Sequence, residues 1–209
     1  MRKGTVINLN GYKFIEFLAK NNTIIILVIF LITGLIIGTF GVKGIEALSN
    51  YSKTYLENFI SDRTGASFLN IVANSFVSSI SVIMIAYVLG SSMFGVVLVP
   101  LFITFRGVLC GGINAVLYSA YAVKGIAFNA VILIPSTIIF IIALLLASGE
   151  SVKFSLKITK ATLPKTVSTN LNADFKMYGC KYIMLCFVVL LSAIIDGVLS
   201  SSFLEYFKL

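Results

Sequence analysis

Long apolar stretches separated by short polar segments dominate the sequence. The first stretch, residues 23–42, has twenty residues without a charged side chain, enough for a helix to cross about 30 Å of hydrocarbon. Further stretches of the same character follow, and only helices or closed barrels satisfy the backbone inside a membrane. We therefore predict an all-α, polytopic membrane helical bundle with five spans, at about residues 23–42, 68–89, 93–123, 126–147 and 182–203.

The polar segments between these stretches differ in character. Residues 1–22 are basic, and we expect them in the cytoplasm ahead of one transmembrane helical domain, residues 23–209. In residues 43–65, charges of alternating sign separate apolar side chains spaced by three, four and seven, which predicts an amphipathic helix on the membrane surface or packed under a partner. Residues 149–181 carry six lysines and predict a cytoplasmic surface attracted to the anionic head groups of membrane lipids.

The distribution of basic residues orients the helices. If residues 93–123 cross once, ten basic residues lie on the side of the N-terminus and five on the other, with Arg106 inside the membrane. If residues 93–123 cross twice, the six lysines move outside and the bias inverts. Because cytoplasmic segments carry the excess of Lys and Arg, the arithmetic favours five spans, with the N-terminus inside and the C-terminus outside. A helix of about thirty residues would be ~45 Å long, so this span is tilted, kinked near Arg106 and Gly107, or extends beyond the bilayer.

Composition supports a cell-membrane protein and excludes several function classes. Hydrophobic residues make up 58% of the chain and charged residues 11%, which is too few charges to cover a water-soluble fold. The chain has 16 basic and 8 acidic residues, and in a membrane protein such an excess reflects the orientation of the spans. We therefore expect no nucleic-acid partner. Histidine is absent, and the three cysteines have neither disulfide nor zinc spacing. We predict a protein that is not an enzyme and binds no metal or cofactor.

Two charges inside predicted spans are the sharpest functional candidates. Arg106 lies fourteen residues beyond Ser92, and Asp196 lies fifteen residues beyond Lys181, which places both at similar depths of ~21–22 Å. A charge in mid-span normally faces the bundle interior, a water-filled cavity or a counter-ion. We therefore predict that Arg106 and Asp196 pair across the bundle. A role of Arg106 in binding or in a conformational switch, or its snorkelling to a thinned membrane, are the alternatives.

Other small or polar residues in the spans predict helix packing. Two GxxxG patterns allow close helix approach within one chain, with dimerisation as the alternative, and we expect the amides to face the bundle and the proline to kink its span. The packing glycines are Gly34, Gly38, Gly107, Gly111 and Gly112; the amides are Asn74, Asn114 and Asn129; the proline is Pro135.

In order and spacing, these features resemble the stage II sporulation protein M family over nearly the whole chain. The glycine-bearing first span "TGLIIGTFGV" leads into the aromatic segment "LSNYSKTYLENFI", and "GSSMFGVVLVPLFITFRGVLCGG" resembles the central span of the family. The proline-bearing "VILIPSTIIFIIALLLASG" and the acid-bearing "CKYIMLCFVVLLSAIIDGVLSS" follow. One departure is that many members have polar residues after this proline, whereas here Ser136 and Thr137 precede a purely apolar run.

The resemblance implies a membrane protein of endospore formation. Members of this length act in engulfment at the septal membrane, where they scaffold or localise a lytic transglycosylase and an amidase/endopeptidase that degrade peptidoglycan. Relatives outside sporulation work beside ABC transporters in the maturation, export or immunity of circular bacteriocins, which gives the main alternative. A small transporter subunit is the third.

Overall fold

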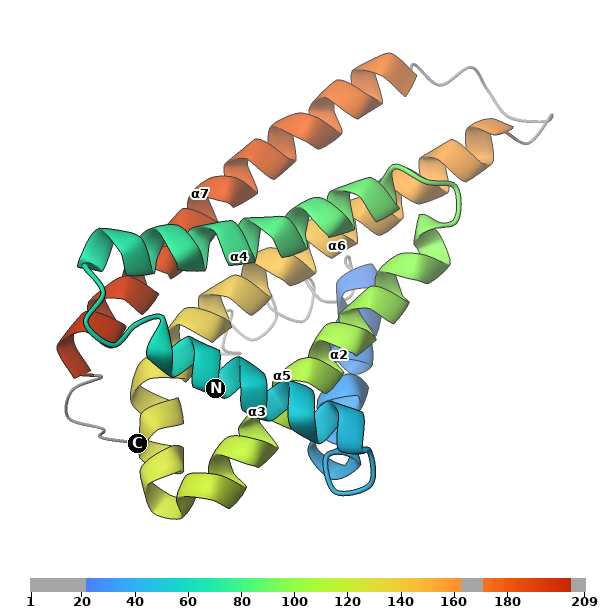
Figure 1. Cartoon of the computed structure of the whole chain (residues 1–209). Helices are drawn as coiled ribbons and strands as arrows, with labels where there is room; N and C mark the ends of the chain where they lie inside the picture. Colours follow the sequence, from blue (N-terminus) through green and yellow to red (C-terminus); the bar gives the residue numbers. More distant parts are fainter. Residues whose placement is uncertain (1–21, 163–170, 204–209) are drawn as a thin grey trace, which may run out of the picture.

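The computed structural model describes residues 22–162 and 171–203, and within these ranges the chain consists of helices joined by short connections, with no strand. This confirms the predicted all-α class. The predictions for the basic N-terminal segment lie almost wholly outside the described residues. The elements are α2 (Asn22–Gly41), α3 (Glu46–Ser61), α4 (Phe68–Gly90), α5 (Gly95–Phe128), the π-helical turn η1 (Asn129–Leu133), α6 (Ile134–Thr162) and α7 (Leu171–Phe203) (Figure 1).

Four helical runs in the described part of the chain are long and apolar enough to cross a membrane. They are Asn22–Gly41, Phe68–Gly90, Gly95–Thr159 and Asn172–Phe203. The third run is 65 residues long and contains Ala122, whose φ of 45° and ψ of −122° are not helical. Figure 1 shows the chain reversing its direction between α5 and α6. The helix is interrupted at Ala122, just before the end of the predicted span 93–123, while the count of five spans and their orientation stay predictions.

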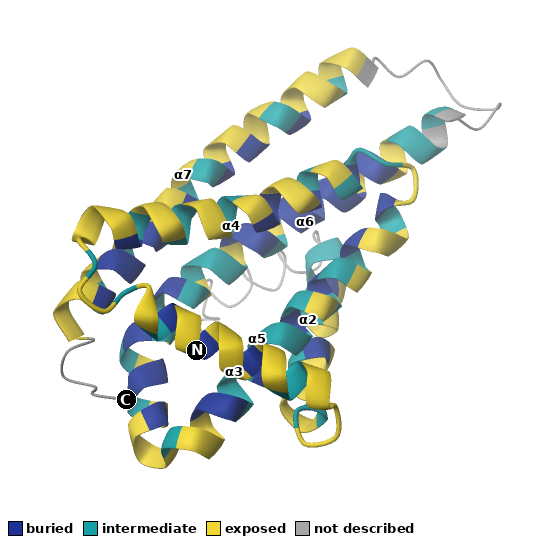
Figure 2. Ribbon diagram, in the orientation of Figure 1, coloured by how far each residue is buried: buried dark blue, intermediate teal, exposed yellow. Residues whose placement is uncertain are grey.

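The outer surfaces of these helices are apolar. On α2, only Leu27, Gly34 and Gly38 are buried, whereas isoleucine and phenylalanine side chains such as Ile29, Ile37 and Phe40 are exposed (Figure 2). Large exposed apolar surfaces are rare on water-soluble monomers. These apolar outer surfaces are therefore suited to contact with lipid.

Helices α2 and α5 cross at glycines. Gly34 and Gly38 lie against the backbone of α5, and Gly107 and Gly111 lie against the backbone of α2. A Cβ atom placed on Gly38 would overlap the carbonyl oxygen of Val108. Since lipid supplies no hydrophobic drive between helices, such close backbone approach stabilises the crossing through dispersion contacts. The predicted packing glycines therefore serve contacts within this chain.

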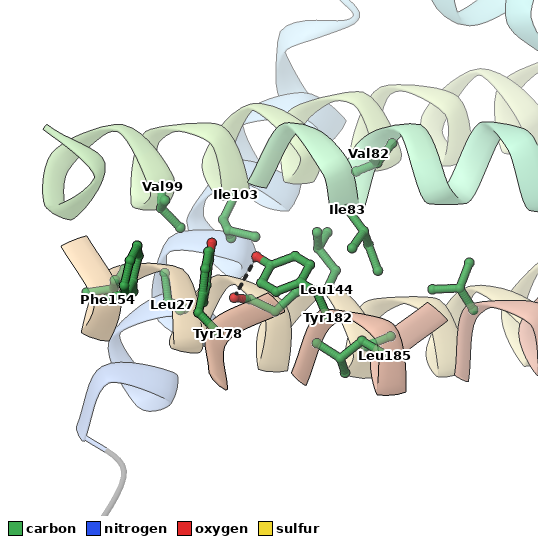
Figure 3. Close-up of a cluster of buried hydrophobic side chains, with 14 residues drawn as sticks. Leu27, Val82, Ile83, Val99, Ile103, Leu144, Phe154, Tyr178, Tyr182 and Leu185 are labelled. Atoms are coloured by element: carbon green, nitrogen blue, oxygen red, sulfur yellow. Dashed lines mark hydrogen bonds between the residues drawn. The ribbon is translucent and has the colours of Figure 1, made fainter. Parts of the chain in front are cut away.

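An aromatic core joins α4, α6 and α7 at the end of the bundle away from α3. The ring of Tyr178 stacks between those of Tyr87, at 4.8 Å, and Phe154, at 4.4 Å. The Ser151 hydroxyl donates a hydrogen bond to the backbone oxygen of Ala86 (2.9 Å), and the Tyr182 hydroxyl donates one to the backbone oxygen of Ala147 (3.0 Å; Figure 3). Each hydroxyl is buried and satisfied, so this core is both packed and hydrogen-bonded.

This core corrects the interpretation of residues 149–181 as a polar surface segment. In the structure, α6 continues to Thr162 and α7 begins at Leu171, so most of the segment forms helices. Lys153 and Lys157 are exposed on one face, while Phe154 and Ser155 are buried on the other. Lysines dominate the overall composition of the segment. A prediction from this composition therefore did not identify the buried face of the helix.

Pro135 lies at the start of α6, directly after the π-helical turn. A proline within a helix cannot donate its backbone hydrogen bond, and its ring clashes with the carbonyl four residues earlier, here that of Val131. A wider turn at residues 129–133 accommodates this clash. The distortion predicted at Pro135 thus takes the form of a π-helical turn that precedes it.

We expect Gly38→Ala to lower the stability of the protein by about 1–3 kcal/mol, because the added methyl group forces α2 away from α5. The measurement is the unfolding midpoint of the purified protein in a mild detergent. Gly44→Ala is the matched control, since a Cβ atom there meets nothing within 4 Å. Equal midpoints for the two variants would contradict the close crossing.

The five-span topology predicts opposite sides for two sets of exposed lysines. In a background without the native cysteines, Lys53→Cys and Lys124→Cys should react with an impermeant thiol reagent on intact cells. Lys157→Cys should react only after the cells are permeabilised, because the positive-inside rule places it in the cytoplasm. Labelling of Lys157→Cys on intact cells would refute the orientation.

Candidate functional site

A cavity of about 420 Å³ with both polar and apolar lining lies between α4, α5, α6 and α7 on the side covered by α3. Its volume is within the usual range for small-molecule sites. The cavity is lined by side chains from five helices and the π-helical turn. Some carry hydroxyl, amide or charged groups, and others, including the isoleucines and Phe140, are apolar. The polar lining includes Tyr55, Asn58, Asp62, Arg63, Asn74, Ser75, Ser78, Ser79, Arg106, Asn114, Asn129, Ser136, Thr137, Ser192 and Asp196.

Helix α3 lines one side of the cavity with Tyr55, Asn58 and Phe59, and its apolar face packs beside it. Leu56 and Phe59 are buried and belong to a cluster with Leu117, Phe128 and Ile132. The rings of Phe59 and Phe128 meet edge to face at 6.5 Å. The predicted amphipathic helix is therefore confirmed, and its apolar side packs on α5 and the π-helical turn of its own chain.

A buried ion pair fixes the end of α3 to α7. The Arg63 Nη2 atom lies 2.5 Å from the Asp196 Oδ2 atom, and the two side chains are only 12% and 9% exposed. Ser75 donates a further hydrogen bond to the same carboxylate oxygen, and the guanidinium carbon lies 3.5 Å from the ring centre of Phe59. Three elements thus meet at Asp196: the α3–α4 connection, α4 and α7.

The predicted pair of Arg106 and Asp196 is wrong. Asp196 pairs with Arg63, which the sequence places in the polar segment outside the membrane. The prediction compared the membrane depths of charged residues inside the predicted spans only. It therefore left out Arg63, which reaches Asp196 from the segment that connects two spans. The available signal was the position of Arg63 at the end of the amphipathic helix, a few residues before a span.

Arg106 lies in the cavity wall without an ionic partner among the described residues. No carboxylate lies within 4.0 Å of it, and its Nε atom is buried without a hydrogen-bond partner. The centre of the Phe140 ring lies 5.8 Å from the guanidinium carbon. The cavity therefore contains one positive charge that forms no ion pair with any described residue.

The three predicted asparagines all line this cavity. The Asn129 side-chain amide donates hydrogen bonds to the Asn114 Oδ1 atom, at 3.2 Å, and to the Tyr118 hydroxyl. At the α3 side, loss of hydration raises the pKa of the Tyr55 hydroxyl, while the positive charges of Arg63 and Arg106 lower it less. Tyr55 therefore remains protonated and able to donate a hydrogen bond at neutral pH.

Metal-ligating clusters and disulfides are absent from the described residues. Within residues 22–162 and 171–203, no group of three or more His, Cys, Asp or Glu side chains could hold a metal ion. Cys110, Cys180 and Cys186 are free thiols. The cavity offers the unpaired cation of Arg106, the carboxylate of Asp62, one neutralised ion pair and many neutral hydrogen-bonding groups, a set suited to binding.

A comparison with protein families gives one match. The model of the family described as stage II sporulation protein M matches residues 9–201, nearly the whole chain. No curated protein and no solved structure matches the chain. The family match confirms the resemblance drawn from the order of the spans.

A double-mutant cycle tests the ion pair. Arg63→Gln and Asp196→Asn should each destabilise the protein by about 3 kcal/mol, because each leaves the other charge buried and unpaired. The double variant should lose less than the sum, with a coupling of about 1–3 kcal/mol. Unfolding in detergent gives these values.

The comparison cycle combines Arg106→Gln with Asp196→Asn, for which we expect weaker coupling. Stronger coupling in this second cycle than in the first would contradict the assignment of Arg63 as the partner of Asp196.

Proposed function

Since the chain belongs to the stage II sporulation protein M family, we propose that this sporulation membrane protein acts as a scaffold that holds peptidoglycan-degrading enzymes at the septal membrane during engulfment. Its apolar helical runs supply the membrane attachment. The partners expected from the family are a lytic transglycosylase and an amidase/endopeptidase. In this role the protein contributes binding surfaces and performs no chemistry on the wall.

The exposed face of α3 is the observation that supports this proposal. The chain itself covers Ser52, Leu56 and Phe59, while Tyr51 is 49% exposed and Lys53 and Glu57 are exposed on another side of the helix. Tyrosine is enriched at protein interfaces, because its ring provides contact area and its hydroxyl a hydrogen bond. In the predicted topology this face points outward, toward the cell wall.

The polar cavity favours a second candidate function. A membrane component that works with an ABC transporter in peptide maturation, export or immunity would need a polar site inside the bundle, and so would a small transporter subunit. The proteins that accompany the chain distinguish these functions. Wall hydrolases support the scaffold, whereas an ATPase together with a peptide precursor supports the alternative.

We expect a pull-down from sporulating cells in mild detergent to recover wall hydrolases with the full-length protein. Tyr51→Ser and Lys53→Glu should reduce the recovery at least fivefold without lowering the level of the protein, because both side chains are exposed. Lys153→Glu is the matched control, since it reverses the same charge at the opposite end of the bundle. Equal loss in all three variants would show that α3 is not the contact surface.

The purified full-length protein should release no soluble fragments from peptidoglycan, since its described residues hold no catalytic arrangement. A known wall hydrolase assayed in the same detergent is the positive control. Efficient cleavage by the isolated protein would overturn the scaffold proposal.

A further inference from the structure

The uncompensated charge of Arg106 is the feature that the scaffold function leaves unexplained. A basic side chain near the middle of a span is unfavourable unless a counter-ion or water stabilises it. The carboxylate of Asp196, which the sequence pattern paired with Arg106, already has Arg63 and Ser75 as partners. Asp62 also lines the cavity, but it is exposed and forms no ion pair. Among the described residues, no carboxylate therefore forms an ion pair with Arg106, and its guanidinium group lines the cavity without a direct counter-ion.

Neutral hydrogen-bonding groups line the same cavity as this cation. The amides of Asn74 and Asn114 and the hydroxyls of Ser78, Ser79 and Thr137 line the same cavity. A guanidinium group offers several N–H donors in a planar fork that fits the oxygens of a phosphate, and neutral donors around it can satisfy the remaining oxygens. The wall thus provides the groups that recognise an oxyanion with more than two acceptor atoms.

The size and position of the cavity indicate how such an anion enters. At about 420 Å³ the cavity exceeds the volume of a bare phosphate ion, and part of its wall is apolar, including Ile113, Ile138 and Phe140. Asn74 and Ser78 on α4 are exposed, so the cavity is accessible along this helix from outside the bundle. A phosphate attached to an apolar body fits both properties.

We propose that the cavity binds one phosphate group, carried by an anionic phospholipid or free in solution, with Arg106 as its counter-ion. The guanidinium group of Arg106 contacts the phosphate oxygens, and the amide and hydroxyl groups of the wall hold the rest of the head group. Arg63 is a positioning residue, because its ion pair with Asp196 keeps α3 over the cavity. This binding does not depend on the scaffold function.

The test uses the full-length protein purified in a non-ionic detergent. Native mass spectrometry counts the phosphatidylglycerol molecules that remain bound during a titration, with phosphatidylcholine as the zwitterionic comparison. Inorganic phosphate is titrated separately, and the shift of the thermal unfolding midpoint is recorded. We expect one tightly bound anion per chain, and the probe that saturates at the lower concentration identifies whether lipid or free phosphate is its source.

Arg106→Gln should weaken this binding at least tenfold, whereas Lys124→Gln should leave it unchanged. The control removes one positive charge from the same helix, but at an exposed position. Without ligand, Arg106→Gln should unfold at the same temperature as the original protein or higher, because it removes a charge that the protein does not neutralise. A merely structural counter-ion role would predict a lower midpoint.

A second pair of variants serves if Arg106→Gln does not fold. Arg106→Lys keeps the charge and loses the planar fork, and Thr137→Val removes one hydroxyl at nearly constant volume. Each should weaken phosphate binding severalfold. Absence of a saturable phosphate site, or binding that is unaffected by the variants of Arg106, would overturn the proposal.

Discussion

The buried ion pair between Arg63 and Asp196 sets the arrangement of the outer half of the bundle. Two charges with 12% and 9% exposure are stable only because they neutralise each other and because Ser75 also bonds the carboxylate. The pair ties the corner between α3 and α4 to α7, and this places the apolar side of α3 over the cavity. It also occupies Asp196, so Arg106 has no carboxylate partner among the described residues.

The two halves of the bundle are held together by different interactions. Around the crossing of α2 and α5, glycines bring backbones into direct contact, and the aromatic core around Tyr178 fills the space between α4, α6 and α7. The half under α3 contains the cavity of about 420 Å³, whose lining includes polar side chains of α4, α5, α6 and α7.

Helix α3 has two faces with separate roles. Its buried face, with Leu56 and Phe59, completes the core and covers the cavity, and its exposed face, with Tyr51 and Lys53, is available to a partner. A scaffold needs an exposed surface of this kind that does not contribute to its own folding. The phosphate site lies on the other side of the same helix, so the two proposed activities use different residues.

The sequence by itself determined the features that depend on local pattern. Runs of apolar residues gave the class and the helix positions, such as residues 68–89 against the observed Phe68–Gly90, and the GxxxG spacing identified glycines that lie at a helix crossing. Tertiary structure alone decided which charges meet. Asp196 takes its partner from a segment 133 positions earlier in the chain, and the buried face of residues 149–162 is defined by helices packed against it. Periodicity records which side of a helix is apolar, but the partner of a charge depends on the path of the whole chain.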